Sequence, residues 1–289
     1  SWQWLLVVNL PLGLMALIAA LALPAASGTR DRPDPASMAL SAGGFAALVF
    51  GAEAVAARPM LAGMLLLAAS LAFWALFRRE LPKRAPLIPI DLLQGRPFRL
   101  SVIASVCCFA GQTAGMLALP FHLQQGLGLS ALMTGLYMTP WPLAVAVAAL
   151  ASARLGEHLP SWLMCAAGCG LLATGLTGAA GLPASAGPLQ VAALTVLCGL
   201  GFGLFQVPNN RTLFLSAPIT RSGAAGGMQG TARLTGQAVG AVVMTLLFAW
   251  APAEAAPRLA LALGAVFALA AASASFMQLC RGAWSVRKR

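Results

Sequence analysis

A small set of amide and guanidinium side chains interrupts the long apolar stretches of this sequence. Arg233 and Gln237 lie one helical turn apart within one stretch. Gln112, Thr113 and Gln206 lie within two others, and Asn209 and Asn210 follow Gln206 at the end of its helix. Such groups can hydrogen-bond a small molecule, and polar residues inside a membrane span usually face a water-filled path. We expect these seven residues to line that path and contact substrate. The amides could instead bond between helices.

Arg233 has two readings. It lies about ten residues into the apolar run that begins at Gly223, which favours a position facing a cavity. If the helix instead begins near Gly227, the long side chain could extend to the membrane surface.

The other reactive side chains form no catalytic or metal-binding arrangement. His122 and His158 lie at stretch ends without a metal-ligand partner at useful spacing. Glu53 is the only carboxylate near a stretch interior and is expected to be solvated, so the spans hold no well-buried Asp or Glu. The cysteines are expected to be free thiols of apolar character: Cys107, Cys108, Cys165, Cys169, Cys198 and Cys280. The sequence therefore predicts no enzyme, no metal site and no cofactor.

Nine apolar stretches must position these residues. They run near 5–23, 37–57, 60–77, 100–121, 131–153, 162–182, 189–208, 223–250 and 258–280. Each approaches the roughly 20 residues that a spanning helix needs. Only 9% of the chain is charged, against about 25% for soluble domains. The sequence predicts an all-α polytopic bundle of about nine transmembrane helices in the lipid bilayer.

The basic residues divide unequally between the two sides of such a bundle. Of 18 Lys and Arg residues, fifteen fall on one side, Arg58 and Arg258 fall on the other, and Arg233 lies within a span. Cytoplasmic loops concentrate these residues. We therefore expect a protein of the inner cell membrane. Its loops 24–36 and 78–99 and its C-terminus would lie in the cytoplasm. No soluble basic face interleaved with aromatics is visible, so we expect no nucleic-acid partner.

Three glycine patterns occur within the stretches. Gly199, Gly201 and Gly203 could be mistaken for a dinucleotide-binding loop, but that motif requires a preceding strand. The pairs Gly111–Gly115 and Gly236–Gly240 have GxxxG spacing. We expect all three patterns to permit close helix packing, and the helices concerned could also slide during transport.

Loop lengths group the spans into one, two and six. The predicted segments are 1–24 (last helix of an N-terminal half), 25–36 (linker), 37–77 (central helix pair), 78–99 (linker), 100–281 (six-helix half) and 282–289 (basic tail). The run 86–93 is expected to lie at the interface as a short amphipathic helix. Six helices form one half of a large transporter class, built from inverted three-helix repeats, here 100–182 and 189–280.

Several motifs along the chain resemble the fourteen-span drug:proton antiporters of the major facilitator superfamily. They are SWQWLLVVNLPLG (1–13), LPFHLQQGLGLS (119–130), GLGFGLFQVPNNR (199–211), SGAAGGM (222–228) and TARLTGQ (231–237). Their order and spacing cover essentially the whole chain. Two departures are His122, where an aromatic is usual, and Glu157-His158, where a loop motif usually has basic residues.

The resemblance implies a partial major-facilitator fold that begins at about the sixth span. The chain opens with Ser1 and no recognisable signal peptide, so we expect it to continue a longer protein whose N-terminal half is missing. The implied function is multidrug efflux, with small drug-like compounds exchanged for protons by alternating access. The alternatives are a non-transporting half-bundle that needs a partner, and a different secondary permease.

Overall fold

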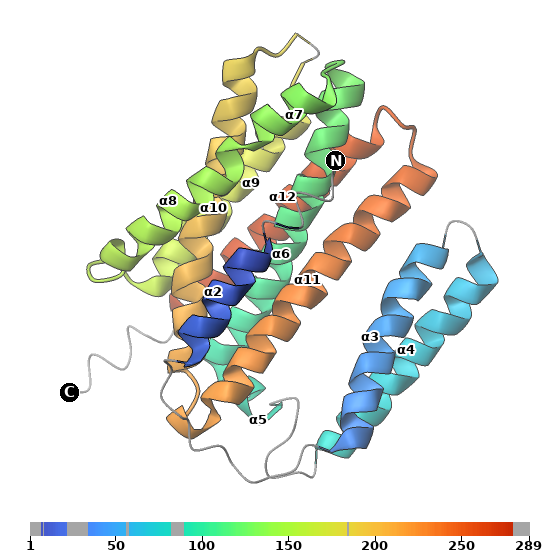
Figure 1. Cartoon of the computed structure of the whole chain (residues 1–289), viewed down its shortest axis with the longest axis vertical. Coiled ribbons are helices and arrows are strands. Elements are labelled where there is room, and N and C mark those ends of the chain that lie inside the picture. The colour runs from blue at the N-terminus through green and yellow to red at the C-terminus, as the bar shows by residue number, and fades with distance from the viewer. Residues whose placement is uncertain are drawn as a thin grey trace. The chain divides into compact units, whose positions relative to one another are not determined.

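The computed structural model describes residues 7, 9–21, 34–55, 58–81, 90–183 and 185–279 (Figure 1). Within this part of the chain the secondary structure is helical, with no strand, as the sequence predicts. In chain order the helices are α2 (Asn9–Leu21), α3 (Pro35–Ala54), α4 (Pro59–Glu80), α5 (Ile90–Leu93), α6 (Arg96–Phe121), η1 (His122–Gly126), α7 (Ala131–Met138), α8 (Pro140–Leu155), α9 (Ser161–Ala180), α10 (Pro188–Leu215), η2 (Ile219–Arg221), α11 (Ser222–Trp250) and α12 (Ala256–Phe276).

Eight helical segments in the described ranges are long and apolar enough to cross a membrane. One joins α6 to η1 (Arg96–Gly126), and another joins α7 to α8 (Ala131–Leu155). Of the first predicted span, 5–23, the described helix is α2, with 13 residues, and the rest lies mainly outside the described residues. The all-α polytopic membrane fold is therefore confirmed.

Contacts divide the chain into two compact units, Ser1–Asp34 and Pro35–Arg289. Helix α2 belongs to the first unit and all later helices to the second. The boundary falls inside the predicted linker 25–36. The finer segment limits remain predictions, and most of the run 86–93 lies outside the described residues, which resume at α5.

Proline fixes the starts of many of these helices. Six long helices carry it in the first turn, where the missing amide hydrogen leaves no broken bond: Pro35, Pro59, Pro97, Pro140, Pro188 and Pro257. The break between α7 and α8 falls directly before one of them, Pro140. The sequence therefore sets these boundaries locally.

The six spans after α5 pack as two related triplets (Figure 1). The first triplet is α6, α7–α8 and α9, and the second is α10, α11 and α12. Helix α6 packs against α11 and α12, while α10 packs in the same way against α8 and α9. Because each first helix contacts the second and third helices of the other triplet, the arrangement has an approximate two-fold relation. This agrees with inverted repeats 100–182 and 189–280.

Glycine lets the first helices approach the third helices at equivalent places. A Cβ built on Gly111 of α6 would lie 2.5 Å from the carbonyl oxygen of Gly264 on α12. A Cβ built on Gly201 of α10 would lie 2.6 Å from that of Gly168 on α9. No real Cβ tolerates such distances, so the backbones touch. The expected packing role of these glycines is confirmed.

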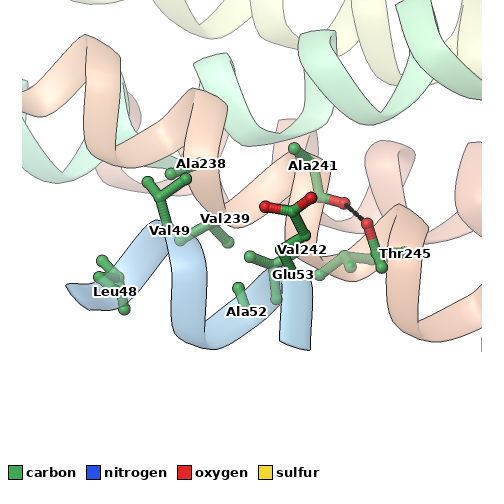
Figure 2. A pocket seen from close by; sticks show the side chains of 10 residues that line it. Leu48, Val49, Ala52, Glu53, Ala238, Val239, Ala241, Val242 and Thr245 are labelled. Atoms are coloured by element: carbon green, nitrogen blue, oxygen red, sulfur yellow. Dashed lines mark hydrogen bonds between the residues drawn. The ribbon is translucent and has the colours of Figure 1, made fainter. Parts of the chain in front are cut away.

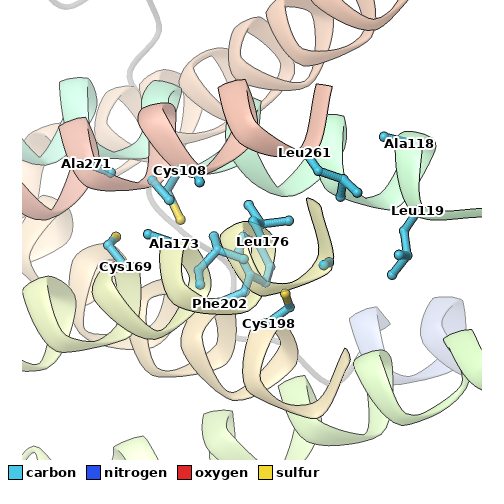
Figure 3. Packing of buried hydrophobic residues seen from close by; sticks show 14 of the residues in the cluster. Cys108, Ala118, Leu119, Cys169, Ala173, Leu176, Cys198, Phe202, Leu261 and Ala271 are labelled. Carbon is cyan, nitrogen blue, oxygen red and sulfur yellow. The ribbon is translucent and has the colours of Figure 1, made fainter. Parts of the chain in front are cut away.

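Alanine, cysteine and leucine fill the interior between the triplets (Figure 3). The five cysteines in the described residues are free thiols, and Cys108, Cys165, Cys169 and Cys198 are buried. Cys165 donates a weak hydrogen bond from Sγ to the carbonyl oxygen of Phe205, at 3.7 Å. These thiols behave as small apolar side chains, as expected, and Cys280 lies outside the described residues.

Candidate functional site

Helices α6 and α10 meet along a line of polar and aromatic side chains. α6 begins, and α10 ends, at the end of the bundle that carries Arg96, Arg99 and Arg211, which we call the basic end. The opposite end holds the end of η1 and the α11–α12 connection. All positions below are given along this axis.

Near the basic end, Asn209 fastens α10 to α6. Its Nδ2 donates to Ser105 Oγ at 2.7 Å and to the Ser101 carbonyl oxygen at 3.3 Å. The side chain is only 1% exposed. Gln278, after α12, donates to Ser101 Oγ at 3.3 Å and so extends the network. Asn209 therefore makes an interhelical bond, the alternative left open by the sequence, and offers little surface to a substrate.

Phe109 and Phe202 form the middle of this line. Their ring centroids lie 5.3 Å apart with an interplanar angle of 78°, an edge-to-face contact between α6 and α10. The sequence analysis did not single out either residue. The spacing of Ser101, Ser105 and Phe109 by four residues could have indicated a shared face of α6.

Two predicted glutamines flank the aromatic pair. Gln112 lies one turn beyond Phe109, and Gln206 lies one turn beyond Phe202 towards the basic end; both are half-buried. Gln112 Nε2 contacts Met116 Sδ at 3.0 Å, a weak acceptor. Asn210 continues the Gln206 side of α10 and is also half-buried. These amides keep donors and acceptors that a bound molecule could use.

Helix α11 adds Arg233 and Gln237 to the same side of the bundle. Gly226, Arg233 and Gln237 are spaced by seven and four residues and so share one stripe of the helix. At Gly226 that stripe reaches α10, because a Cβ built there would lie 3.7 Å from the ring of Phe214. Arg233 is exposed and Gln237 is half-buried. The stripe therefore faces the side on which α10 lies.

The structure also locates the start of the helix that carries Arg233. α11 begins at Ser222, so Arg233 lies eleven residues in, about 16 Å along the axis. The alternative start near Gly227 is wrong.

Thr113 of α6 packs against α11, since a Cβ built on Gly240 of α11 would lie 3.1 Å from Thr113 Cβ. We call Phe109, Phe202, Gln112, Gln206, Asn210, Arg233 and Gln237 the polar stripe.

Loops at the basic end are tied by arginine. Arg211 Nη1 donates to the Gly156 carbonyl oxygen at 3.2 Å, joining α10 to the α8–α9 connection. Arg221 makes a bidentate pair with Asp91 of α5, at 2.9 and 3.2 Å. In the loop Ser152–Pro160, where the family usually has basic residues, the Gly156 carbonyl oxygen is therefore bonded by the guanidinium of Arg211 from α10.

The carboxylate prediction needs a correction. Helix α4 continues to Glu80, whose side chain is fully buried and accepts a hydrogen bond from Ser37 Oγ at 2.5 Å. The sequence analysis assigned this residue to a polar linker. The expectation that the spans hold no well-buried Asp or Glu is therefore wrong, because α3 covers the end of α4.

Glu53 borders an apolar crevice of about 420 Å³ between α3 and α11 (Figure 2). The walls include Leu48, Val49, Val239 and Val242. Glu53 is exposed, as expected, although its side chain extends towards α11. Among the described residues no group of three or more His, Cys, Asp or Glu side chains could hold a metal ion.

Comparisons with known proteins agree with this architecture. Residues 1–241 match the sequence model of the Major Facilitator Superfamily. The chain belongs to this superfamily. This family is one of membrane transporters and not of enzymes.

The curated relatives include transporters and export proteins. The chain is 40% identical over 253 residues to the uncharacterized transporter YebQ of Escherichia coli, covering 86% of this chain and 55% of that protein. It is 31% identical to the cephamycin export protein CmcT of Amycolatopsis lactamdurans (84% and 52%) and 27% identical to a tetracenomycin C resistance and export protein of Streptomyces glaucescens (86% and 47%). The chain spans about half the length of these relatives.

Proposed function

We propose that this chain forms one wall of a proton-coupled exporter of small amphipathic compounds. The family and the relatives named as export proteins support this direction of transport. The membrane would be the inner membrane, with the basic end and the C-terminus in the cytoplasm, because the basic residues gather there. The rest of the relatives' length would supply an opposing N-terminal half.

The observation that carries the proposal is the polar stripe. The buried aromatic pair Phe109–Phe202 holds α6 against α10, and half-buried amides and one exposed guanidinium lie near this level on α6, α10 and α11. A ligand site of this type combines apolar walls with few polar groups that fix orientation. An amphipathic compound would fit such a site, because its polar groups can bond the amides while its apolar body packs on the apolar side chains beside them.

The polar residues of the stripe and their neighbours Thr113 and Asn209 have different roles in this proposal. Gln112 and Gln206 would bond polar groups on either side of the rings, and Arg233 would attract an anionic or strongly polar group. Gln237 and Asn210 would line the path beside them, and Thr113 would hold α11 against α6. Asn209 would act indirectly, because its bonds to Ser101 and Ser105 set the register of α10.

Alternating access would follow from motion of this wall against an opposing half. The packed glycine contacts keep α9 on α10 and α12 on α6, so the six helices can move together. The site would then face one side of the membrane at a time. Proton entry would drive export by binding to groups that reach the outside in one state.

Export by the complete parent protein tests the proposal at Arg233. We expect Arg233→Gln to reduce export at least tenfold with unchanged expression, and Arg233→Lys to restore part of it because the positive charge returns. Leu234→Gln is the matched control, since this exposed neighbour lies about 100° around the helix from Arg233. Wild-type export by Arg233→Gln would remove Arg233 from the substrate path.

A further inference from the structure

A second polar pocket lies at the end of the bundle opposite the basic end. It has a volume of about 250 Å³ and forms where η1 meets the α11–α12 connection and the start of α12. Its lining residues are His122, Gln125, Gly126, Glu254, Pro257 and Arg258. It lies apart from the polar stripe, and none of the roles above uses it.

His122 is the unusual group of this pocket. The side chain is 2% exposed, and its Nε2 has no hydrogen-bond partner within the described part of the chain. The imidazole packs against Gly126, where a built Cβ would lie 3.1 Å from Nδ1. An unpaired buried nitrogen costs about 1–3 kcal/mol. A second state of His122 in which this atom is paired would recover that free energy.

The backbone holds the imidazole there through a local irregularity. Pro120 lies in the last turn of α6, where it donates no amide hydrogen and its ring crowds the carbonyl of the preceding turn. The chain then widens into the π-helical turn His122–Gly126. Such turns occur frequently at functional sites.

Two charged groups of opposite sign line the pocket with His122. Arg258 Nη2 donates to the Leu182 carbonyl oxygen at the end of α9, at 3.2 Å, which holds the guanidinium in place. Glu254, on the α11–α12 connection, is exposed and makes no hydrogen bond or ion pair with another described residue. Its carboxylate is therefore available as an acceptor. Gln125 and Pro257 complete the lining without a charge.

The two-fold relation of the triplets supplies an independent observation. At the basic end, the end of α10 is fastened to the α8–α9 connection by Arg211 and the Gly156 carbonyl oxygen. The equivalent junction joins the end of α6 to the α11–α12 connection, and this is the His122 pocket. There, no hydrogen bond between described residues crosses the junction. The junction at the basic end is therefore joined by a hydrogen bond. Its counterpart holds polar and charged side chains that could form one but do not.

We propose that this pocket is a proton-binding site. A proton from the adjacent water adds to the neutral imidazole of His122, and the imidazolium then donates a hydrogen bond from Nε2 to the Glu254 carboxylate. This pairing satisfies the buried nitrogen and fastens α6 to the α11–α12 connection, as Arg211 does at the other end. The link to export rests on the proposed function, whereas proton uptake can be measured without transport.

Nitrogen-15 NMR of histidine-labelled protein in lipid nanodiscs tests the site, because the chain has only two histidines. His158 lies exposed in the α8–α9 connection and serves as the internal reference, assigned by His158→Gln. We expect the His122 imidazole to take up a proton as the pH is lowered from about 8 to 5. Glu254→Gln should lower its titration midpoint by about half a pH unit or more, because the imidazolium loses a negative neighbour.

The opposite charge gives the opposite shift. Arg258→Gln should raise the His122 midpoint, and Arg258→Lys should leave it near the wild-type value, while His158 should stay constant throughout. A His122 signal that remains neutral over this pH range would overturn the site. So would a midpoint that is the same in wild type and Glu254→Gln. Export without proton uptake by the complete parent would instead overturn the proposed coupling and leave the titration intact.

Discussion

At the scale of single residues, neighbouring amides in this chain have different surroundings. Asn209 and Asn210 are adjacent in sequence, yet Asn209 is buried against α6 and Asn210 is half-exposed. Successive residues on a helix point about 100° apart, so one of two adjacent side chains can face a neighbouring helix while the other does not. Asn209 therefore holds two helices together, whereas Asn210 could contact substrate.

Unfolding measurements should show that difference. Asn209→Ala removes the bond to Ser105 Oγ and should lower the free energy of unfolding by about 1–2 kcal/mol. Asn210→Ala, the matched control, should change it by less than about 0.5 kcal/mol. A double-mutant cycle with Ser105→Ala should give a coupling energy of about 0.6 kcal/mol or more. Additive effects of Asn209→Ala and Ser105→Ala would show that the bond contributes nothing.

At the scale of helices, the stability of the bundle depends on places where two backbones touch. Gly168 and Gly201 are in mutual contact across the α9–α10 interface, whereas Gly170 on the same helix has open space around it. Gly168 is therefore required for the close contact of the two helices, whereas Gly170, two positions later, is not. Only the packing partner distinguishes them.

Gly168→Ala and Gly170→Ala form a matched pair on α9. The first places a methyl group 2.6 Å from the Gly201 carbonyl oxygen, which forces the helices apart and should lower stability by about 1–3 kcal/mol or more. The second meets no atom and should be neutral or stabilising by up to about 1 kcal/mol, because alanine favours the helix. Thermal unfolding in detergent measures both. Equal midpoints for the two variants would contradict the close contact of α9 and α10.

At the scale of the whole molecule, the orientation in the membrane is the first prediction. In a background without the six native cysteines, Gln94→Cys in the α5–α6 connection should react with an impermeant maleimide only after the cells are opened. Ser185→Cys, exposed in the α9–α10 connection, should react in intact cells. The basic-residue asymmetry is the physical reason. Labelling of position 94 from outside sealed cells would reverse the proposed topology.

The second prediction at this scale concerns transport by residues 1–289 alone. We expect no substrate-dependent proton flux from this chain in liposomes with an imposed pH gradient, because one wall has no opposing half to close against. The complete parent is the positive control. Saturable flux from the chain alone would indicate that two copies rebuild both walls.

The amino-acid sequence by itself determined that the chain lies in the lipid bilayer, that it is helical, and where most helices begin and end. These properties depend on apolar content summed over about 20 residues and on prolines that act locally, so no distant contact changes them. It also determined which polar residues interrupt the spans, including Arg233 and Gln237. The motif order resembles the family that the comparisons then showed.

Only the tertiary structure decided what each of those residues touches. Glu80 is buried because Ser37, 43 positions earlier, lies across from it on α3, and Asn209 finds Ser105 at a separation of 104 residues. Phe109 and Phe202 meet for the same reason. His122 lies in a pocket because a π turn after Pro120 brings it beside the α11–α12 connection. A side chain's role depends on partners that are distant in sequence, and hydropathy carries no information about that pairing.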